Sequence, residues 1–223
     1  MKNIAELIVR PYQPEDQEAV LVIAADTAFF GQPVERYLDD RRLFIDTFYR
    51  YYADHEGDHS WVACADGEVV GFLMGCLNTE QQRRRLAKEN IPQVVWGMLN
   101  GQYGIGRRTI RYGFHLARAV LHQEIPEADF DLYPAHLHLN LAAPWRGFGL
   151  GRQLLLAYLA QLRALNVPGV HLDTTSVNQA ACHLYEAQGF RLLEQRRTRL
   201  WEGLVVEAVY ARTYGMRLAK ISS

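Results

Sequence analysis

The most informative part of the sequence is Arg146-Gly147-Phe148-Gly149-Leu150-Gly151-Arg152. It follows an alternating apolar run, Ala135–Leu141, and precedes a helical apolar pattern that starts near Gln153. Glycines allow the chain to turn sharply and leave backbone N–H groups open, and a following helix aims the positive end of its dipole at the same place. An arginine at each end can pair with phosphate oxygens. This strand, turn and helix therefore predict a binding site for a phosphorylated ligand.

The turn lacks the features of two common nucleotide-binding motifs. No Lys-Ser or Lys-Thr pair follows its last glycine, as a P-loop requires. Arg152 stands where the dinucleotide fingerprint needs its third glycine. The pattern that remains is Arg-x-x-Gly-x-Gly, so the phosphate belongs to another class of ligand.

The flanking sequence predicts strands and helices on both sides of the turn. Upstream, we expect a strand at Leu7–Tyr12, a helix that begins near Pro14, a second helix at about Val34–Tyr52, and a hairpin of strands Ser60–Ala65 and Glu68–Leu77. Downstream, we expect a helix at Gly151–Leu165, a strand at Val170–Asp173, a helix at Asn178–Gln188, and closing strands Phe190–Trp201 and Val205–Tyr214 that meet at Glu202-Gly203. One domain over residues 1–223 is the simplest organisation.

Residues 78–134 are unusually long for a connection between two strands. Apolar runs at Val94–Trp96 and Phe114–Leu121 predict two helices, with a flexible loop at Gly101–Gly106 between them. Residues 80–125 hold eight Lys or Arg and three Asp or Glu. A solvated helix face, a site for an acidic acceptor and a nucleic-acid surface are the three interpretations of this charge. We expect this insertion and the aromatic second helix to line the acceptor pocket.

Composition sets broad limits on the class of protein. The chain has 223 residues and a net charge of -1, which gives no general argument for nucleic-acid binding. Cys64, Cys76 and Cys182 fit neither a zinc pattern nor a disulfide framework, so no metal is expected. The first residues do not form a signal peptide, and no apolar stretch is long enough to cross a membrane. A cytoplasmic protein is expected.

A second motif lies downstream of the glycine turn. It reads Asn178-x-x-Ala181-x-x-x-Tyr185-x-x-x-Gly189-Phe190. Together with Arg146-x-x-Gly149-x-Gly151, it resembles the GNAT superfamily of acyl-coenzyme A-dependent N-acetyltransferases, and the resemblance covers most of the chain. The stretch Tyr133–Leu139 and the insertion before it further resemble the acetyltransferase-like domain of O-GlcNAcase-type proteins and their free-standing bacterial relatives.

The GNAT resemblance implies a fold and a co-substrate. The fold is α/β (α+β), with a mixed, mostly antiparallel central sheet, a splayed parallel strand pair, helices on both faces and a long helical insertion before the fourth strand. The co-substrate is acetyl-CoA, whose arm enters between the splayed strands. The implied contacts are Leu139, Leu141 and Ala142 for the arm, Arg146, Gly147, Phe148, Gly149, Leu150, Gly151 and Arg152 for the pyrophosphate, and Asn178 for the arm. Arg152 as a solvated residue and Asn178 as a helix cap remain alternatives.

The resemblance also implies direct transfer of an acetyl group to a primary amine of a small molecule or protein. Tyr185 would protonate the departing thiolate. His138, His136 and Asp173 are the candidates to accept the proton of the amine, because Asn140 cannot serve as a base. Each histidine is alternatively a structural residue with satisfied hydrogen bonds.

Two other function classes compete with an acetyltransferase. One is a non-catalytic acyl-CoA-binding sensor or interaction module, which the missing carboxylate at Asn140 suggests. The other is a protein that binds nucleic acid through the basic insertion, although the acids Glu124–Asp131 that follow weaken this interpretation. The edges of the closing strands also leave a homodimer open.

Overall fold

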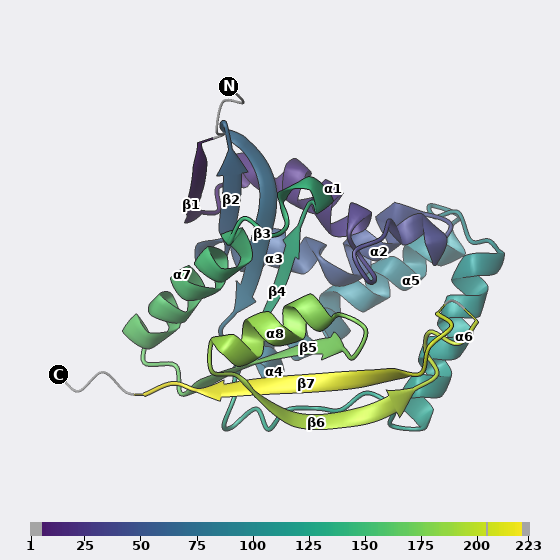
Figure 1. Ribbon diagram of the computed structural model, residues 1–223. Coiled ribbons are helices and arrows are strands. Elements are labelled where there is room, and N and C mark those ends of the chain that lie inside the picture. The colour runs from purple at the N-terminus through teal and green to yellow at the C-terminus, as the bar shows by residue number, and fades with distance from the viewer. Residues whose placement is uncertain (1–5, 204, 220–223) are drawn as a thin grey trace.

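The computed structural model describes residues 6–203 and 205–219, and its centre is a seven-stranded sheet (Figure 1). The strand order is β1-β2-β3-β4-β5-β7-β6, and only β4 and β5 run parallel to each other. The strands are β1 (Leu7–Pro11), β2 (Trp61–Ala65), β3 (Glu68–Cys76), β4 (Ala135–Leu141), β5 (Gly169–Thr175), β6 (Arg191–Thr198) and β7 (Val209–Arg217). The predicted mixed, mostly antiparallel sheet is confirmed.

Helices cover both faces of this sheet and bury a separate apolar core against each. On one face lie α1 (Gln17–Asp26), α2 (Arg41–Phe48) and α3 (Arg50–His55), and on the other lie α7 (Leu150–Ala164) and α8 (Gln179–Ala187) (Figure 1). Successive side chains of β3 serve the two cores alternately: Phe72 belongs to the first and Leu73 to the second. The sheet is buried on both sides, which explains the high apolar content of its central strands.

The predicted second helix is wrong as a single element. Residues 34–52 form a short 3-10 turn, α2 and the start of α3, with breaks at 37–40 and at Tyr49. Asp40 caps α2, because its side chain accepts a hydrogen bond from the backbone N–H of Arg42 at 2.9 Å. Phe44, Tyr51 and Tyr52 of this segment are buried and Phe48 is exposed, while the cap at Asp40 divides the segment.

The closing strands are shorter than the sequence predicted. β6 ends at Thr198 and β7 begins at Val209, so a ten-residue connection replaces the expected tight turn at Glu202-Gly203. Leu200 and Trp201, expected inside the strand, leave the sheet and pack into the first core. This tertiary packing overrides the strand propensity of the apolar residues.

The insertion forms two helical segments, as predicted. The first is continuous through α4 (Thr79–Arg85), a π-helical stretch Leu86–Asn90 and α5 (Ile91–Leu99), and the second is α6 (Arg107–Leu121). Asp39 holds the start of α6: Oδ2 accepts from the N–H groups of Gly106 and Thr109 and from Thr109 Oγ1, each at 2.9 Å. Among the helices that the structure describes, none has the length and apolar content needed to cross a membrane.

Candidate functional site

The splay between β4 and β5 opens the candidate site. The two strands pair only at Ala135 with Val170 and at His136 with His171, whereas β4 stays paired to β3 as far as Leu141. From Leu137 onward the side of β4 that faces β5 therefore has no strand partner. The splayed parallel pair implied by the resemblance is present.

A groove of about 490 Å³ follows this gap and ends at the glycine turn. The predicted residues that line it are Leu139, Leu141, Arg146, Gly147, Gly149, Gly151, Arg152, Asn178 and Tyr185. Ala142, Phe148 and Leu150 are not among its lining residues. The Leu150 side chain is fully buried in the second core, and Phe148 is exposed. Any ligand contact of Leu150 would therefore come from its backbone.

The turn itself has the geometry of an anion site. Gly147 and Gly149 have φ angles of +86° and +79°, which favour glycine, and a Cβ atom on either would project into open space. Gly149 is the N-cap of α7, so the first N–H groups of that helix have no partner within it. These open donors and the helix dipole fit the predicted phosphate.

Arg146 is exposed at the edge of the groove, and its guanidinium contacts two segments of the chain. Its Nε donates to the backbone carbonyl of Leu141 at 3.1 Å. Its guanidinium lies against Gly31, where a Cβ atom would approach Nη1 to 2.7 Å. Thr27, Phe30 and Gly31, in the segment after α1, thus form a wall of the groove that sequence reasoning missed. In the sequence, the glycine at position 31 is the one hint of an unusual backbone there, and in the structure Gly31 has a φ of +69°.

Tyr185 and Asn178 come from α8 and its start and line both the groove and an adjoining inner cavity. The Tyr185 ring packs near Phe190, and its hydroxyl has no hydrogen-bond partner among the described residues. Burial raises the pKa of Tyr185, which keeps the phenol protonated. Asn178 occupies the N-cap position of α8, yet its side chain makes no capping hydrogen bond and stays free to contact a ligand.

A buried polar network separates the roles of the two predicted histidines. His136 is 8% exposed, with Nδ1 2.6 Å from Thr79 Oγ1 and Nε2 2.6 Å from the Tyr52 hydroxyl. The Thr79 hydroxyl donates to the carbonyl of Pro134, so Nδ1 of His136 carries the proton and Nε2 accepts from Tyr52. Both nitrogens of His136 are thus occupied, and the residue does not line the cavity.

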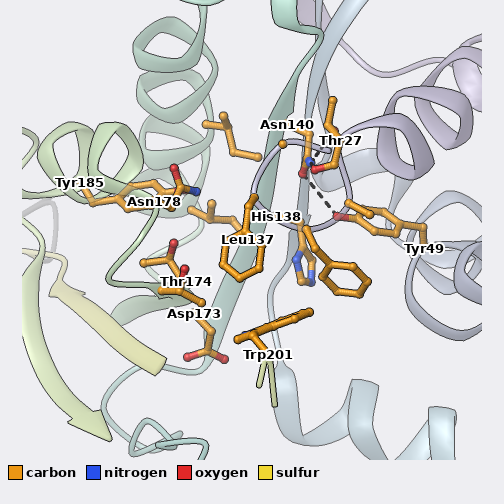
Figure 2. Close-up of a pocket in the computed structure, with 16 residues that line it drawn as sticks. Thr27, Tyr49, Leu137, His138, Asn140, Asp173, Thr174, Asn178, Tyr185 and Trp201 are labelled. Atoms are coloured by element: carbon orange, nitrogen blue, oxygen red, sulfur yellow. Dashed lines mark hydrogen bonds between the residues drawn. The ribbon is translucent and has the colours of Figure 1, made fainter. Parts of the chain in front are cut away.

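His138, by contrast, lines the inner cavity, which has a volume of about 230 Å³ (Figure 2). Its Nε2 lies 3.0 Å from the Tyr52 oxygen and donates to it, because the single Tyr52 proton goes to His136. This leaves Nδ1 of His138 as the unprotonated nitrogen. Burial, and secondarily His171, lower the pKa of His138 to about 4, so the ring is neutral at physiological pH.

Asn140 is a bridging residue in the wall of the site. Tyr49 donates its hydroxyl proton to Oδ1 at 3.3 Å, and Nδ2 donates to Thr27 Oγ1 at 2.7 Å (Figure 2). The amide therefore connects β4 to the junction between α2 and α3 and to the end of α1. A carboxylate could not donate to Thr27, which explains the amide at this position.

Asp173 lies near the end of β5, at the inner cavity. Its Oδ1 accepts a hydrogen bond from Thr213 Oγ1 at 2.6 Å. The carboxylate is accessible from the cavity but surrounded by protein on its other sides, and this burial raises its pKa. Figure 2 shows Asp173 toward the Trp201 end of the cavity and Tyr185 on the other side of Asn178.

An aromatic cluster forms another wall of the inner cavity. The Trp201 ring centroid lies 4.7 Å from Phe29 and 4.9 Å from Phe30, and all three residues line the cavity. Tyr49 fulfils the expectation that the aromatic second segment contributes to the pocket. The expectation for the insertion is wrong, because no residue of 78–134 lines either cavity. From the insertion, Tyr112 of α6 packs against Trp201, with the two ring centroids 6.0 Å apart.

Part of the positive charge of the insertion is paired with carboxylates of the described residues. Arg83 lies 3.0 Å from Glu127 and Arg84 lies 2.5 Å from Glu80, while Arg108 donates to the carbonyl of Glu35. This pattern favours the interpretation as a solvated helix face. Over the described ranges, no three His, Cys, Asp or Glu side chains gather in an arrangement that could hold a metal ion.

Comparisons with known proteins agree with this geometry. Residues 129–190, which run from the segment before β4 to the end of α8, match the family model described as the acetyltransferase (GNAT) family. Over 48 residues the chain is 50% identical to mycothiol acetyltransferase of Nocardiopsis dassonvillei, a segment that covers 22% of this chain and only 14% of that protein. The crystal structure of SsHAT is similar over 96% of this chain and 100% of that one, with 28% identity and a TM-score of 0.72. The polyamine N-acetyltransferase of Drosophila melanogaster shares the fold, with 17% identity, a TM-score of 0.60 and coverage of 96% and 100%.

Proposed function

We propose that this chain, which matches the GNAT acetyltransferase family model over residues 129–190, transfers an acetyl group from acetyl-CoA directly to a primary amine. The observation that carries this proposal is one continuous path. The groove leads from the glycine turn along the unpaired side of β4 to Tyr185, and there it meets the inner cavity. The segment shared with a protein named mycothiol acetyltransferase supports acetyl transfer.

The residues along the groove fit acetyl-CoA. Open N–H groups of residues 147–152, including those of Phe148 and Leu150, bind the pyrophosphate, and Arg152 adds positive charge at the same end. The backbone of Leu139, Leu141 and Ala142 pairs with the pantetheine arm, because β4 has no strand partner there. Asn178 supplies a side-chain amide that its own helix does not use.

Tyr185 and His138 supply the two proton transfers. The nitrogen lone pair of the neutral amine forms a bond to the acetyl carbon as the carbon–sulfur bond breaks. Tyr185 donates the proton that the departing sulfur takes up, and its raised pKa keeps that proton in place until then. His138 accepts the proton that the nitrogen loses, through the unprotonated Nδ1. His136 acts as a positioning residue, because it holds Tyr52 against His138.

The acceptor class follows from the size of the inner cavity. A volume of about 230 Å³ admits a small molecule or one extended side chain, but not a folded surface. Either a small amine or an exposed protein amine on a flexible segment fits this limit.

A binding assay and a thiol-release assay test the proposal together. We expect saturating acetyl-CoA to raise the melting temperature and a panel of amines to release free thiol. Tyr185→Phe should retain the acetyl-CoA affinity and lower kcat by about 10²-fold, because one proton donor is lost. Tyr210→Phe, at an exposed tyrosine on β7, is the matched control and should leave kcat unchanged.

The alternatives give different results in the same assays. If neither acetyl-CoA nor coenzyme A shifts the melting temperature, the groove does not bind this co-substrate and the proposal fails. Binding without thiol release from any amine would instead identify a non-catalytic coenzyme-binding module.

A further inference from the structure

We propose that the inner cavity selects a small amine that carries a second cationic group, and that Asp173 and the aromatic wall bind this second charge. The inference rests on the proposed function and specifies the acceptor. Short alkyl diamines are the simplest molecules of this class.

The charge of the cavity is the first observation. Among the residues that line it, Asp173 is the one carboxylate, and there is no lysine or arginine. His138 is neutral, because burial lowers its pKa to about 4. Arg83, a nearby cation, is not a lining residue; it pairs with Glu127 and stacks over Phe130 at 4.7 Å. The cavity therefore presents a net negative charge to a ligand.

The second observation is that Asp173 is incompletely compensated. Oδ1 accepts from Thr213, but Oδ2 has no hydrogen-bond donor in the described part of the chain. Asp173 is an exposed residue near the end of β5 and lines the cavity, so Oδ2 is open to a donor on a ligand. A bound ammonium group would supply both the missing donor and the missing positive charge.

Aromatic rings flank the same end of the cavity. Trp201 is 7% exposed, lies at the Asp173 end of the cavity (Figure 2), and packs beside Phe29 and Phe30. Ring faces attract organic cations, and a desolvated site strengthens that attraction. A carboxylate beside aromatic rings binds an alkylammonium better than a neutral polar group does.

Asp173 lies away from the place where acetyl transfer is proposed, so it can bind the far end of the acceptor. Tyr185 and Asn178 lie where the cavity joins the groove, whereas Asp173 lies toward Trp201 (Figure 2). An acceptor with its reacting nitrogen near Tyr185 thus extends its remaining atoms toward Asp173. A second ammonium group on a short alkyl chain would end beside the carboxylate.

The decisive experiment compares matched acceptors with wild-type protein and Asp173→Asn. The acceptors are 1,4-diaminobutane, 1-aminobutane and 4-amino-1-butanol, which differ in the far group. Wild type should use the diamine with at least tenfold higher kcat/KM. Asp173→Asn should lower kcat/KM for the diamine by about 10- to 100-fold, the range for a lost charged hydrogen bond, and change the monoamines less than threefold. Direct titration of the diamine, without acetyl-CoA, measures binding apart from turnover.

Asp173→Asn keeps a side-chain oxygen that can accept the hydrogen bond from Thr213 Oγ1, so this variant should fold with an undiminished melting temperature. Equal use of diamine and monoamines by wild type overturns the inference and leaves the proposed function intact. Loss of kcat for every amine in Asp173→Asn also overturns it, because Asp173 would then be the proton acceptor. Saturable diamine binding that weakens in Asp173→Asn, with no turnover of any amine, supports the cation site and contradicts the proposed function.

Discussion

Tyr52 is the side chain that connects the two histidines of β4. Its hydroxyl meets Nε2 of His136 at 2.6 Å, Nε2 of His138 at 3.0 Å and the amide of Gln82 at 3.2 Å. No polar group in this network can turn without leaving another unsatisfied, because the surroundings are buried. A residue outside the predicted catalytic set therefore fixes which nitrogen of His138 is free to accept a proton.

Tyr52→Phe should cost about 1–3 kcal/mol of stability, because it leaves buried hydrogen-bonding groups unsatisfied. It should also lower kcat without a comparable change in the acetyl-CoA affinity. Tyr51→Phe is the matched control: that residue is equally buried, and its hydroxyl donates only to Glu56. Urea unfolding and thiol-release kinetics measure both effects. Equal kcat in the two variants would contradict a positioning role for Tyr52.

The lowered pKa of His138 predicts a pH dependence of stability. Above the unfolded-state pKa of 6.5 the ring is neutral in both states and contributes nothing. As the pH falls from 6.5 toward 4, the unfolded chain takes up a proton that the folded chain does not, so the free energy of unfolding decreases. At pH 5 this loss amounts to about 2 kcal/mol.

Comparing this decrease in the free energy of unfolding between wild type and His138→Gln isolates the contribution of His138. The lowered pKa of His136 destabilises both proteins at low pH and is present in each. Urea unfolding at pH 7 and pH 5 should show a smaller loss in His138→Gln than in wild type. His122→Gln, at an exposed histidine after α6, serves as the control. Identical losses in wild type and His138→Gln would refute the assignment.

At the scale of elements, the glycine turn has its effect through the helix that follows it. Gly147 and Gly149 adopt left-handed backbone conformations that bring the chain from β4 into the start of α7 with open N–H groups. The hairpin between β2 and β3 uses the same conformation for a different purpose, since Asp66 and Gly67 have φ angles of +51° and +85°. Backbone geometry alone does not distinguish a ligand turn from a structural turn; the neighbouring helix does.

This pair of turns provides a matched test. Gly147→Ala and Gly67→Ala change residues with φ angles of +86° and +85°, and a Cβ atom meets nothing within 4 Å at either position. Both variants should therefore lose a similar amount of stability, about 1–2 kcal/mol. Only Gly147→Ala should weaken acetyl-CoA binding, by tenfold or more, because its methyl group occupies the phosphate site. Calorimetric titration distinguishes them, and equal affinities would exclude the turn as the pyrophosphate site.

At the scale of the whole molecule, the insertion connects to the site indirectly. α6 packs Tyr112 behind Trp201, and Trp201 forms part of the cavity wall. Asp39 joins the start of α6 to the segment before α2. The insertion thus supports the acceptor cavity without lining it.

Asp39→Ala should loosen this support, because it removes the acceptor for three hydrogen bonds at the start of α6. We expect faster hydrogen exchange in residues 100–112 and a higher KM for the amine, while the acetyl-CoA affinity is retained. Asp58→Ala, at an aspartate whose side chain makes no hydrogen bond in the described structure, is the control. Unchanged exchange in α6 would show that Asp39 does not hold the insertion.

The strand–turn–helix and the start of α8 could be predicted from the sequence, because glycine conformations, helix caps and apolar periodicity are local properties of the chain. The sequence therefore predicted the central sheet and most of the groove, from Leu139 to Arg152. It could not separate His136 from His138, since that distinction depends on Tyr52 and Thr79, which lie more than fifty residues away along the chain. Nor could it place Trp201 or Gly31 in the site. Those residues converge only because the sheet splays between β4 and β5, and the packing of distant segments around that gap is a property of the tertiary structure alone.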